Sequence, residues 1–164
     1  MRGIEKGDWH MSSINEIVKY SSNKVVLDST ALLVKSREFA VYATQLVKAS
    51  VRHKKKYCMT ETACKNLYKV AGSSNHTARE EASNACRLIE QLKGLGCLQI
   101  IPVGENGKGK HQETLDLISQ SNGVVIFCRD RLLAETIKDR AEIYHVDRHG
   151  HAVPWTDFMQ RQTA

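Results

Sequence analysis

The chain has 164 residues, 41% of them hydrophobic and 26% charged, which suits one domain with a single core. It lacks the roughly 18 consecutive apolar residues of a membrane span and the apolar block of a secretory signal. Its five scattered cysteines form no C-x-x-C pair. We therefore expect a cytoplasmic protein with reduced thiols and no membrane partner, and its net charge of +6 favours polyanionic partners.

The N-terminal part of the sequence predicts a loosely attached segment followed by a buried strand. Residues 1–22 show little periodicity beyond a short helix at Ile14–Tyr20. Val25–Leu27 is an apolar, partly β-branched run that ends on Asp28, and apolar residues then recur at helical spacing as far as Val47. This pattern predicts a strand that passes into a helix through a polar cap.

The middle of the chain alternates short apolar runs with amphipathic segments. Tyr57–Thr60 is short and apolar, whereas Glu61–Val70 and Thr77–Lys93 have the periodicity of helices. Cys97–Val103 predicts another strand, and His111–Ser121 predicts a helix after a glycine-rich loop.

The clearest strand of the sequence lies in its last third. Val124–Cys128 is apolar without interruption, as is typical of strands covered on both faces. A helix is expected from Leu132 to about Arg140, then a strand at Ile143–Val146 and a terminal helix at Pro154–Arg161.

The alternation of strands and helices predicts an α/β fold, with a small parallel sheet flanked by helices on both faces. We expect an N-terminal segment at residues 1–22, one domain at residues 23–150, and a tail or short helix at residues 151–164.

Five acidic residues stand at the boundaries of these elements. Ligands of open α/β sheets bind just beyond the carboxyl ends of the strands. Asp28 and Asp130 follow two apolar strands, and Glu61 follows a third. Glu113 and Asp116 lie in the first turns of one helix, three residues apart and so on nearly one face. We expect these acids to converge.

Clustered carboxylates repel one another unless a cation lies between them, so the pattern predicts a site for Mg²⁺ or Mn²⁺. Such an ion activates water for attack on a phosphodiester. Ser29 and Thr30 are expected to orient the carboxylate of Asp28. Glu113 is preferred over Asp116 as the third acid because it is closer to the helix start, and Asp116 is an additional candidate ligand.

Basic residues near these segments are candidate contacts to nucleic-acid phosphates. They comprise a basic run, two lysines of the glycine-rich loop and the two arginines beside Asp130: Arg52, Lys54, Lys55, Lys56, Lys108, Lys110, Arg129 and Arg131.

Two segments resemble the PIN-domain family. V-V-L-D-S-T-A-L-L (Val25–Leu33) is similar to the opening of PIN domains, where a strand ends on an aspartate followed by two small hydroxyl or amide residues and an apolar helix. V-V-I-F-C-R-D-R-L-L (Val124–Leu133) resembles their late strand, which ends on another acid. The likeness extends from about Lys24 to Val146.

The resemblance implies a PIN-like fold and a Mg²⁺- or Mn²⁺-dependent ribonuclease. The acidic positions of the family would be occupied here by Asp28, Glu61, Glu113 or Asp116, and Asp130. Toxin-like members dimerise and bind small antitoxin proteins, so the resemblance also implies a homodimer and an inhibitory protein partner, although no residue of the sequence specifies either.

Two other interpretations compete with the nuclease. Residues 104–110 fit the nucleotide-binding pattern G-x-x-x-x-G-K, but His111 stands where a hydroxyl is needed for Mg²⁺. Residues 61–103 resemble a helix-turn-helix with a wing, which would make the protein a non-catalytic nucleic-acid binder. In that case Arg79 and Arg87 would face the groove, and the aspartates would be ordinary helix caps.

Overall fold

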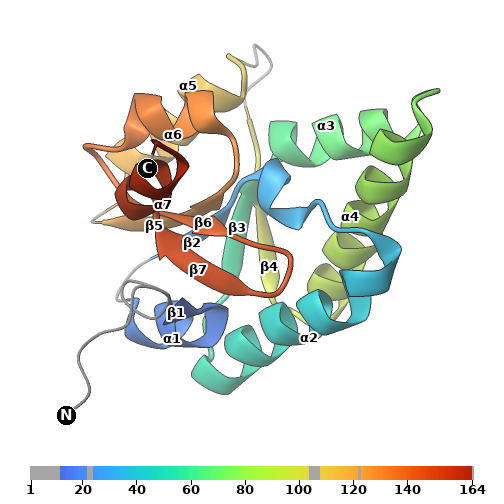
Figure 1. The fold of residues 1–164 in the computed structure, drawn as a ribbon, viewed down its shortest axis with the longest axis horizontal. Coiled ribbons are helices and arrows are strands. Elements are labelled where there is room, and N and C mark those ends of the chain that lie inside the picture. The colour runs from blue at the N-terminus through green and yellow to red at the C-terminus, as the bar shows by residue number, and fades with distance from the viewer. Residues whose placement is uncertain (1–11, 22–23, 104–107, 122, 164) are drawn as a thin grey trace.

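A mixed β-sheet lies at the centre of the computed structural model, which describes residues 12–21, 24–103, 108–121 and 123–163 (Figure 1). Within these residues the sheet has seven strands in the order β1-β7-β6-β5-β2-β3-β4. The strands are β1 (Ser12–Ser13), β2 (Lys24–Leu27), β3 (Tyr57–Thr60), β4 (Leu98–Ile101), β5 (Val124–Cys128), β6 (Glu142–Val146) and β7 (His151–Pro154).

Helices connect and cover these strands. They are α1 (Ile14–Tyr20), the 3-10 helix η1 (Ser29–Leu32), α2 (Ser36–His53), α3 (Glu61–Ala71), α4 (His76–Gly94), α5 (Lys110–Ser119), α6 (Arg131–Ile137) and α7 (Trp155–Thr163). Among the described residues, none of these helices combines the length and the apolar character needed to cross a membrane.

The sheet is wound in both directions from its centre. Strands β2 to β6 are parallel, whereas β7 runs antiparallel to β6, and β1 runs antiparallel to β7. From β2 the chain steps outward through β3 and β4, and it then returns to the other side of β2 as β5. The direction of winding therefore changes between β2 and β5, where Leu27 pairs with Phe127.

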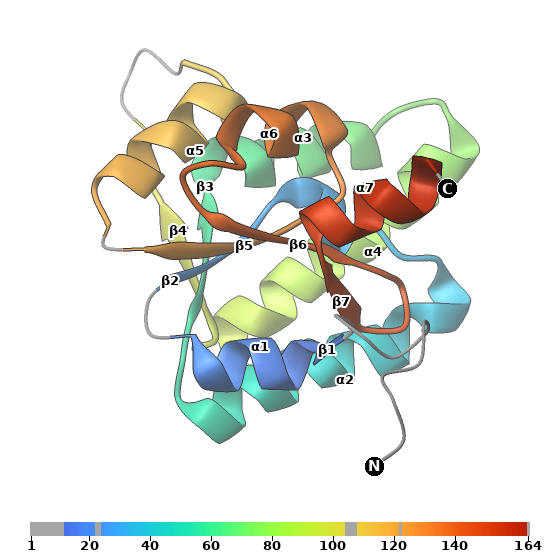
Figure 2. The ribbon, with the colours of Figure 1, turned by 60° about the vertical axis from the view of Figure 1, so that its left-hand side comes forward.

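Alternating side chains of the strands pack into two cores, one on each face of the sheet. Both faces of the sheet are therefore covered, as predicted. Val25 and Leu27 of β2 join a core with residues of α1, α2, α3 and α4. Val26 belongs to a second core with Leu117 of α5 and Leu133 of α6. Figure 2 shows α5 and α6 on one side of β5 and α1, α2 and α4 on the other.

Both ends of the described chain are packed into the fold. The predicted C-terminal helix is present as α7, while residues 1–11 of the predicted N-terminal segment lie outside the described residues. Ile14 and Val18 of α1 are completely buried against the main core. Strands β1 and β7, which the sequence did not predict, extend the sheet beyond β6. Trp155 of α7 is buried in the second core.

The helix expected directly after β2 begins later than predicted. A single 3-10 turn follows Asp28, and the chain is then extended to the start of α2 at Ser36. Two carbonyl groups of this extended segment have side-chain partners in place of helical N–H groups. The guanidinium of Arg129 donates to Leu33 O, and the Asn84 side-chain amide donates to Val34 O.

The turn between β6 and β7 favours glycine. Gly150 has φ of +82°, and a Cβ atom at this position would lie 1.4 Å from Oε1 of Gln45. Gln45 is held there by a hydrogen bond from its side-chain amide to His149 O, at 2.9 Å. The turn is thus locked against α2 on one side and against α1 on the other, since Gly150 O accepts from Ile14 N.

We expect Gly150→Ala to destabilise the protein by about 1–3 kcal/mol, because alanine is strained at this positive φ and its Cβ would displace the Gln45 side chain from His149 O. Gly94→Ala is the matched control, since nothing lies within 4 Å of its Cβ position, and its effect should be about 0.5–1 kcal/mol in the stabilising direction. Urea unfolding measures both. A Gly150→Ala variant as stable as the Gly94→Ala control would contradict this account of the turn.

A histidine of β6 is kept neutral by its surroundings. The ring of His145 stacks on Phe158 of α7, with centroids 3.7 Å apart and planes inclined by 6°. Burial, followed by the charge of Arg129, lowers the pKa of His145 from 6.5 to about 4, although Asp147 opposes this shift. Protonation therefore favours the unfolded chain.

Because the folded pKa lies below the unfolded one, the stability linked to His145 is complete above about pH 6.5 and is lost as the pH falls toward 4. We expect the parent to lose about 1–2 kcal/mol more than His145→Phe between pH 7 and about pH 4.5, allowing for partial exposure of the ring. Urea unfolding of both proteins at the two pH values measures this difference. Equal losses of stability in both proteins would show that His145 is not responsible for the pH dependence.

Candidate active site

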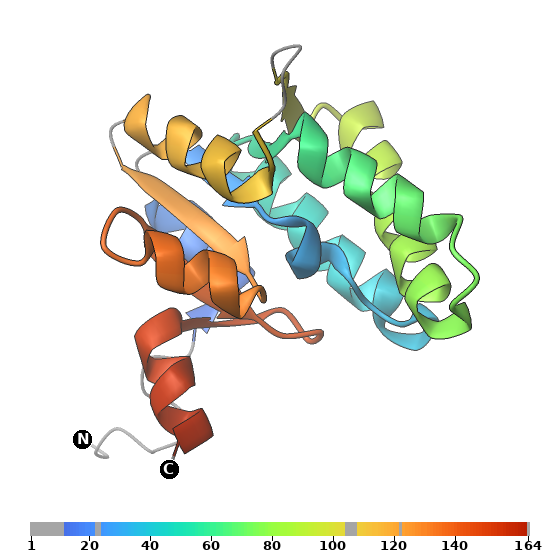
Figure 3. The same cartoon turned by 90° about the horizontal axis from the view of Figure 1, so that it is seen from above.

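Two predicted site residues meet at the point where the winding of the sheet reverses. Asp28 follows the last residue of β2, and Asp130 lies two residues beyond the end of β5, the strand that pairs with β2. Crevices at such a reversal are where open α/β sheets bind ligands. In Figure 3 the segment of β2 and η1 passes between α5 and α6 on one side and α3 and α4 on the other.

A lysine joins the two aspartates. Nζ of Lys110 lies 2.7 Å from Oδ2 of Asp130, and 3.2 Å and 3.3 Å from the two carboxylate oxygens of Asp28. The side chains of Asp28 and Lys110 are only 3% and 15% exposed. Two carboxylates that come from distant parts of the chain thus face one shared cation.

The shared ammonium determines the ionisation of the site. Desolvation would raise the pKa of Asp130, but hydrogen bonds from Lys110 and the Leu133 N–H, together with the charges of Lys110 and His111, hold this pKa below its usual value. Burial would lower the pKa of Lys110, yet the two aspartates raise it above its ordinary value. Asp130 and Lys110 are therefore charged at neutral pH and form an ion pair.

Thr30 fixes the orientation of Asp28. The Asp28 carboxylate caps η1 by accepting from the Thr30 N–H at 3.2 Å, and it accepts from the Thr30 hydroxyl at 2.5 Å. The same hydroxyl oxygen accepts from the N–H of Arg129 at 2.9 Å. Thr30 thus links the end of β2 to the end of β5, as a supporting residue should. Ser29, the other predicted supporting residue, is buried beside it.

Arg129 stabilises the backbone around the site. We predicted a phosphate contact, but its guanidinium donates to Val146 O at 2.6 Å and to Leu33 O at 2.5 Å. It also lies 5.9 Å from the centre of the Tyr42 ring. These contacts tie the ends of β5 and β6 to the segment before α2.

The cysteine beside the aspartates is a poor nucleophile. Cys128 is completely buried, and its Sγ lies 3.9 Å from Oδ2 of Asp28. Burial, and then the negative charge of Asp28, raise its pKa to about 12. A thiol in this state is protonated at neutral pH, and thiol catalysis is therefore disfavoured at this site.

One small cavity lies at the site among the described residues. A cavity of about 10 Å³, roughly the room of one water molecule, lies beside Asp28 and Lys110 and is also lined by Thr60 and Thr114. Across residues 12–21, 24–103, 108–121 and 123–163, no group of three or more His, Cys, Asp or Glu side chains is arranged to hold a metal ion. The structure brings together two of the five predicted acids.

The other predicted acids have different partners. Glu61 opens α3 and pairs with Lys65 at 3.3 Å, with 38% of its side chain exposed. Asp116 is 39% exposed, pairs with Lys108 at 3.6 Å and accepts a hydrogen bond from Gln112. Within the described part of the protein, neither side chain shares a lysine with Asp28 or Asp130.

Glu113 differs from Asp116 because it is buried. Its Oε2 accepts from the N–H of Lys108 at 3.1 Å, which closes the residues before α5 onto the helix. Its Oε1 is buried and has no hydrogen-bond partner among the described residues. Of the two competing candidates for the third acid, Glu113 is therefore the one with an unused oxygen in the interior.

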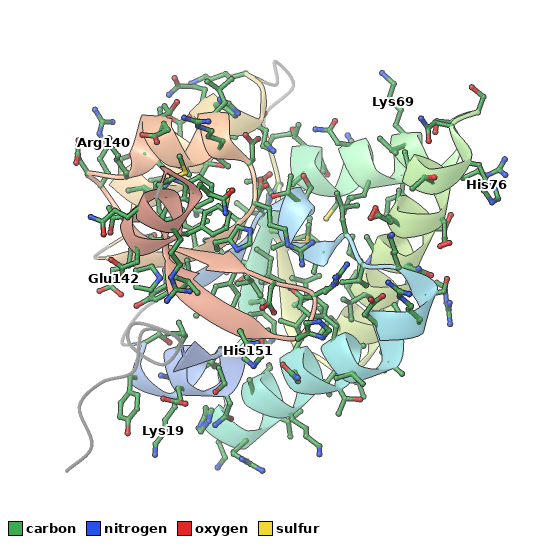
Figure 4. The ribbon with its side chains drawn as sticks, viewed as in Figure 1. Lys19, Lys69, His76, Arg140, Glu142 and His151 are labelled. Atoms are coloured by element: carbon green, nitrogen blue, oxygen red, sulfur yellow. The ribbon has the colours of Figure 1, made fainter. Side chains whose placement is uncertain are left out.

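The basic run lies at the N-terminal ends of the parallel strands, whereas the aspartates lie at their C-terminal ends. Residues 52–56 precede β3, whereas Asp28 and Asp130 follow β2 and β5, which run parallel to β3. Lys55 donates to Val18 O, Lys19 O and Ser21 O, so it caps the end of α1. Figure 4 shows Lys19 at this lower edge. Arg52, Lys54 and Lys56 are exposed there.

Several of the predicted phosphate contacts are closer to the site. Lys110 is inside it, and Nε2 of His111 lies 3.5 Å from Oδ2 of Asp130. Arg131 is exposed at the start of α6, directly after Asp130, and Lys108 is exposed before α5. Positive charge at this edge is thus concentrated at the starts of α5 and α6.

The segment of the helix-turn-helix interpretation is arranged differently from a helix-turn-helix with a wing. Strand β4 pairs with β3 as an edge strand of the main sheet, so it is not a separate wing after α4. Arg79 is exposed, but Arg87 stacks over the ring of Phe39 at 4.6 Å. Residues 104–107 of the nucleotide-binding pattern lie outside the described residues.

Comparison with models of known protein families gives no match for this chain, and a search of the curated proteins also finds none.

The importance of Lys110 as a partner of the aspartates was missed by the sequence analysis. A signal was present, because a lysine directly after a glycine at a strand-to-helix connection is well placed to reach the carboxyl edge of a sheet. We interpreted it as a phosphate contact, since composition and spacing do not show that its side chain faces two acids.

We expect Thr30→Val to destabilise the protein by about 1–3 kcal/mol, because it leaves the Arg129 N–H unpaired and removes a hydrogen bond to a buried charge. Thr30→Ser is the matched control and should lose much less, since it keeps the hydroxyl. Urea unfolding of both variants gives the comparison. If valine and serine had the same effect, the hydroxyl would not be the link between β2 and β5.

Proposed function

We propose that this chain is a divalent-cation-dependent nuclease that hydrolyses phosphodiester bonds, with single-stranded RNA as its substrate. The observation that carries the proposal is the convergence of Asp28 and Asp130 on one cation at the reversal point of the sheet. Carboxylate oxygens that face a common point suit Mg²⁺ or Mn²⁺. The resemblance of the two segments around these aspartates to PIN domains supports the same activity.

The residues of the site have separate roles in this proposal. Asp28 and Asp130 would hold the cation, which supplies an activated water and stabilises charge on the reacting phosphate. Thr30 orients the carboxylate of Asp28, and the N–H of Leu133 orients that of Asp130. Lys110 provides a positive charge at the same place, where a phosphate would approach.

Glu113 is the best candidate for a further acid. It is buried at the start of α5, the helix that carries Lys110, and its Oε1 is unpaired. Glu61 and Asp116 are weaker candidates than Glu113, because both are more exposed and pair with lysines.

Cleavage of labelled single-stranded RNA with Mn²⁺ tests the proposal. We expect the parent to cleave, a chelator to abolish cleavage, and Asp28→Asn and Asp130→Asn each to lower the rate by at least about 100-fold. Asparagine keeps an oxygen that can accept the cap hydrogen bonds but lacks the charge that a cation needs. Glu113→Gln, Glu61→Gln and Asp116→Asn in the same assay rank the remaining acids.

Glu90→Gln is the matched control, because Glu90 is an exposed acid of α4 whose partner is Lys93, and its rate should equal that of the parent. Circular dichroism and melting temperature establish that each variant is folded. The nuclease proposal fails if either folded asparagine variant cleaves like the parent, or if the chelator has no effect. RNA binding without cleavage would instead favour the non-catalytic nucleic-acid binder.

A further inference from the structure

The position between Asp28 and Asp130 is already filled by a cation of the chain itself. The ammonium of Lys110 contacts three oxygens of the two carboxylates at 2.7–3.3 Å. Two carboxylates in such contact with one ammonium have few directions left in which to accept another positive charge. A divalent ion that bound both aspartates at its usual distance of roughly 2.0–2.1 Å would overlap with this ammonium.

The backbone of Lys110 is fixed independently of the contacts of its ammonium. It is the first residue of α5, its carbonyl accepts from the hydroxyl of Thr114 at 2.8 Å, and the preceding Gly109 O accepts from the Glu113 N–H at 3.0 Å. The long side chain is free to rotate about its own bonds once the carboxylates are neutralised by another ion. Movement of the ammonium therefore requires no unfolding of the helix.

We propose that Lys110 is a built-in competitor of the divalent cation, which occupies the cation position in the metal-free protein and leaves it when metal binds. This inference rests on the proposed function, since it concerns the same two aspartates. With Lys110 the two carboxylates carry a net charge of about one negative unit, and a divalent ion in addition changes this to about one positive unit. The site then attracts a phosphate only when it is loaded.

The competition has a simple consequence for regulation. A protein without metal keeps its two acids compensated, so the fold does not depend on the ion. Once displaced, the ammonium of Lys110 remains beside the loaded site and contributes to the binding of an incoming phosphodiester. Metal and nucleic acid are thereby coupled through one side chain, and each should raise the affinity of the other.

Titration of Mn²⁺ into RNA-free protein by calorimetry tests the competition directly. We expect Lys110→Met, which has a similar length but no charge, to bind Mn²⁺ about tenfold or more tightly than the parent. Lys93→Met is the matched control, because it removes an equal charge from an exposed pair on α4, and its affinity should match that of the parent. Equal or weaker binding by a folded Lys110→Met variant would overturn the inference.

A second measurement uses the parent protein and so does not depend on the folding of a variant. Acetylation of lysines, followed by mass spectrometry, should modify Lys110 several-fold faster at saturating Mg²⁺ than without metal, whereas Lys93 should react equally in both. An unchanged rate at Lys110 would mean that its ammonium is not displaced.

The two proposals fail in different ways. If metal binds and RNA is cleaved, but Lys110→Met has parental affinity and the acetylation rate is constant, the competition is wrong and the nuclease stands. If neither the parent nor Lys110→Met binds Mn²⁺ or Mg²⁺, both proposals fall.

Discussion

The pairing of β2 with β5 is the constraint on which the rest of the site depends. It brings Asp28 and Asp130 to one edge of the sheet, although they are far apart in the sequence. Two carboxylates in this position are unfavourable unless positive charge compensates them. Lys110 from α5 supplies that charge, while Thr30 and Arg129 lock the ends of the neighbouring strands in place.

Much of the fold was predictable because it follows local patterns. The apolar run Val124–Cys128 and the short segment Tyr57–Thr60 are strands with the predicted bounds, and Ile14–Tyr20 is the predicted helix. The convergence of Asp28 and Asp130 was also expected, from the general rule that residues beyond the carboxyl ends of parallel strands share one edge. That rule places both residues at the same ends of the strands, but their contact with one lysine also depends on the pairing of β2 with β5. The rule alone predicted the same for Glu61, which pairs with Lys65 instead.

The remaining features depend on contacts between distant segments, which a single sequence does not show. Lys55 and Arg129 look like exposed charges in the sequence, yet both donate hydrogen bonds to backbone carbonyls of other segments. The late start of α2 has the same origin, because Arg129 and Asn84 compete for carbonyls that a helix would have used. The basic run lies away from the aspartates because it precedes a strand, whereas they follow theirs.

The antiparallel strand β7 has a practical consequence for the design of shortened proteins. It covers the edge of β6 and is itself covered by β1, so the two ends of the described chain protect the same side of the sheet. A fragment trimmed to residues 23–150 would expose the backbone of β6 as an open edge, which invites pairing between molecules and aggregation. Expression boundaries should therefore retain at least residues 12–163.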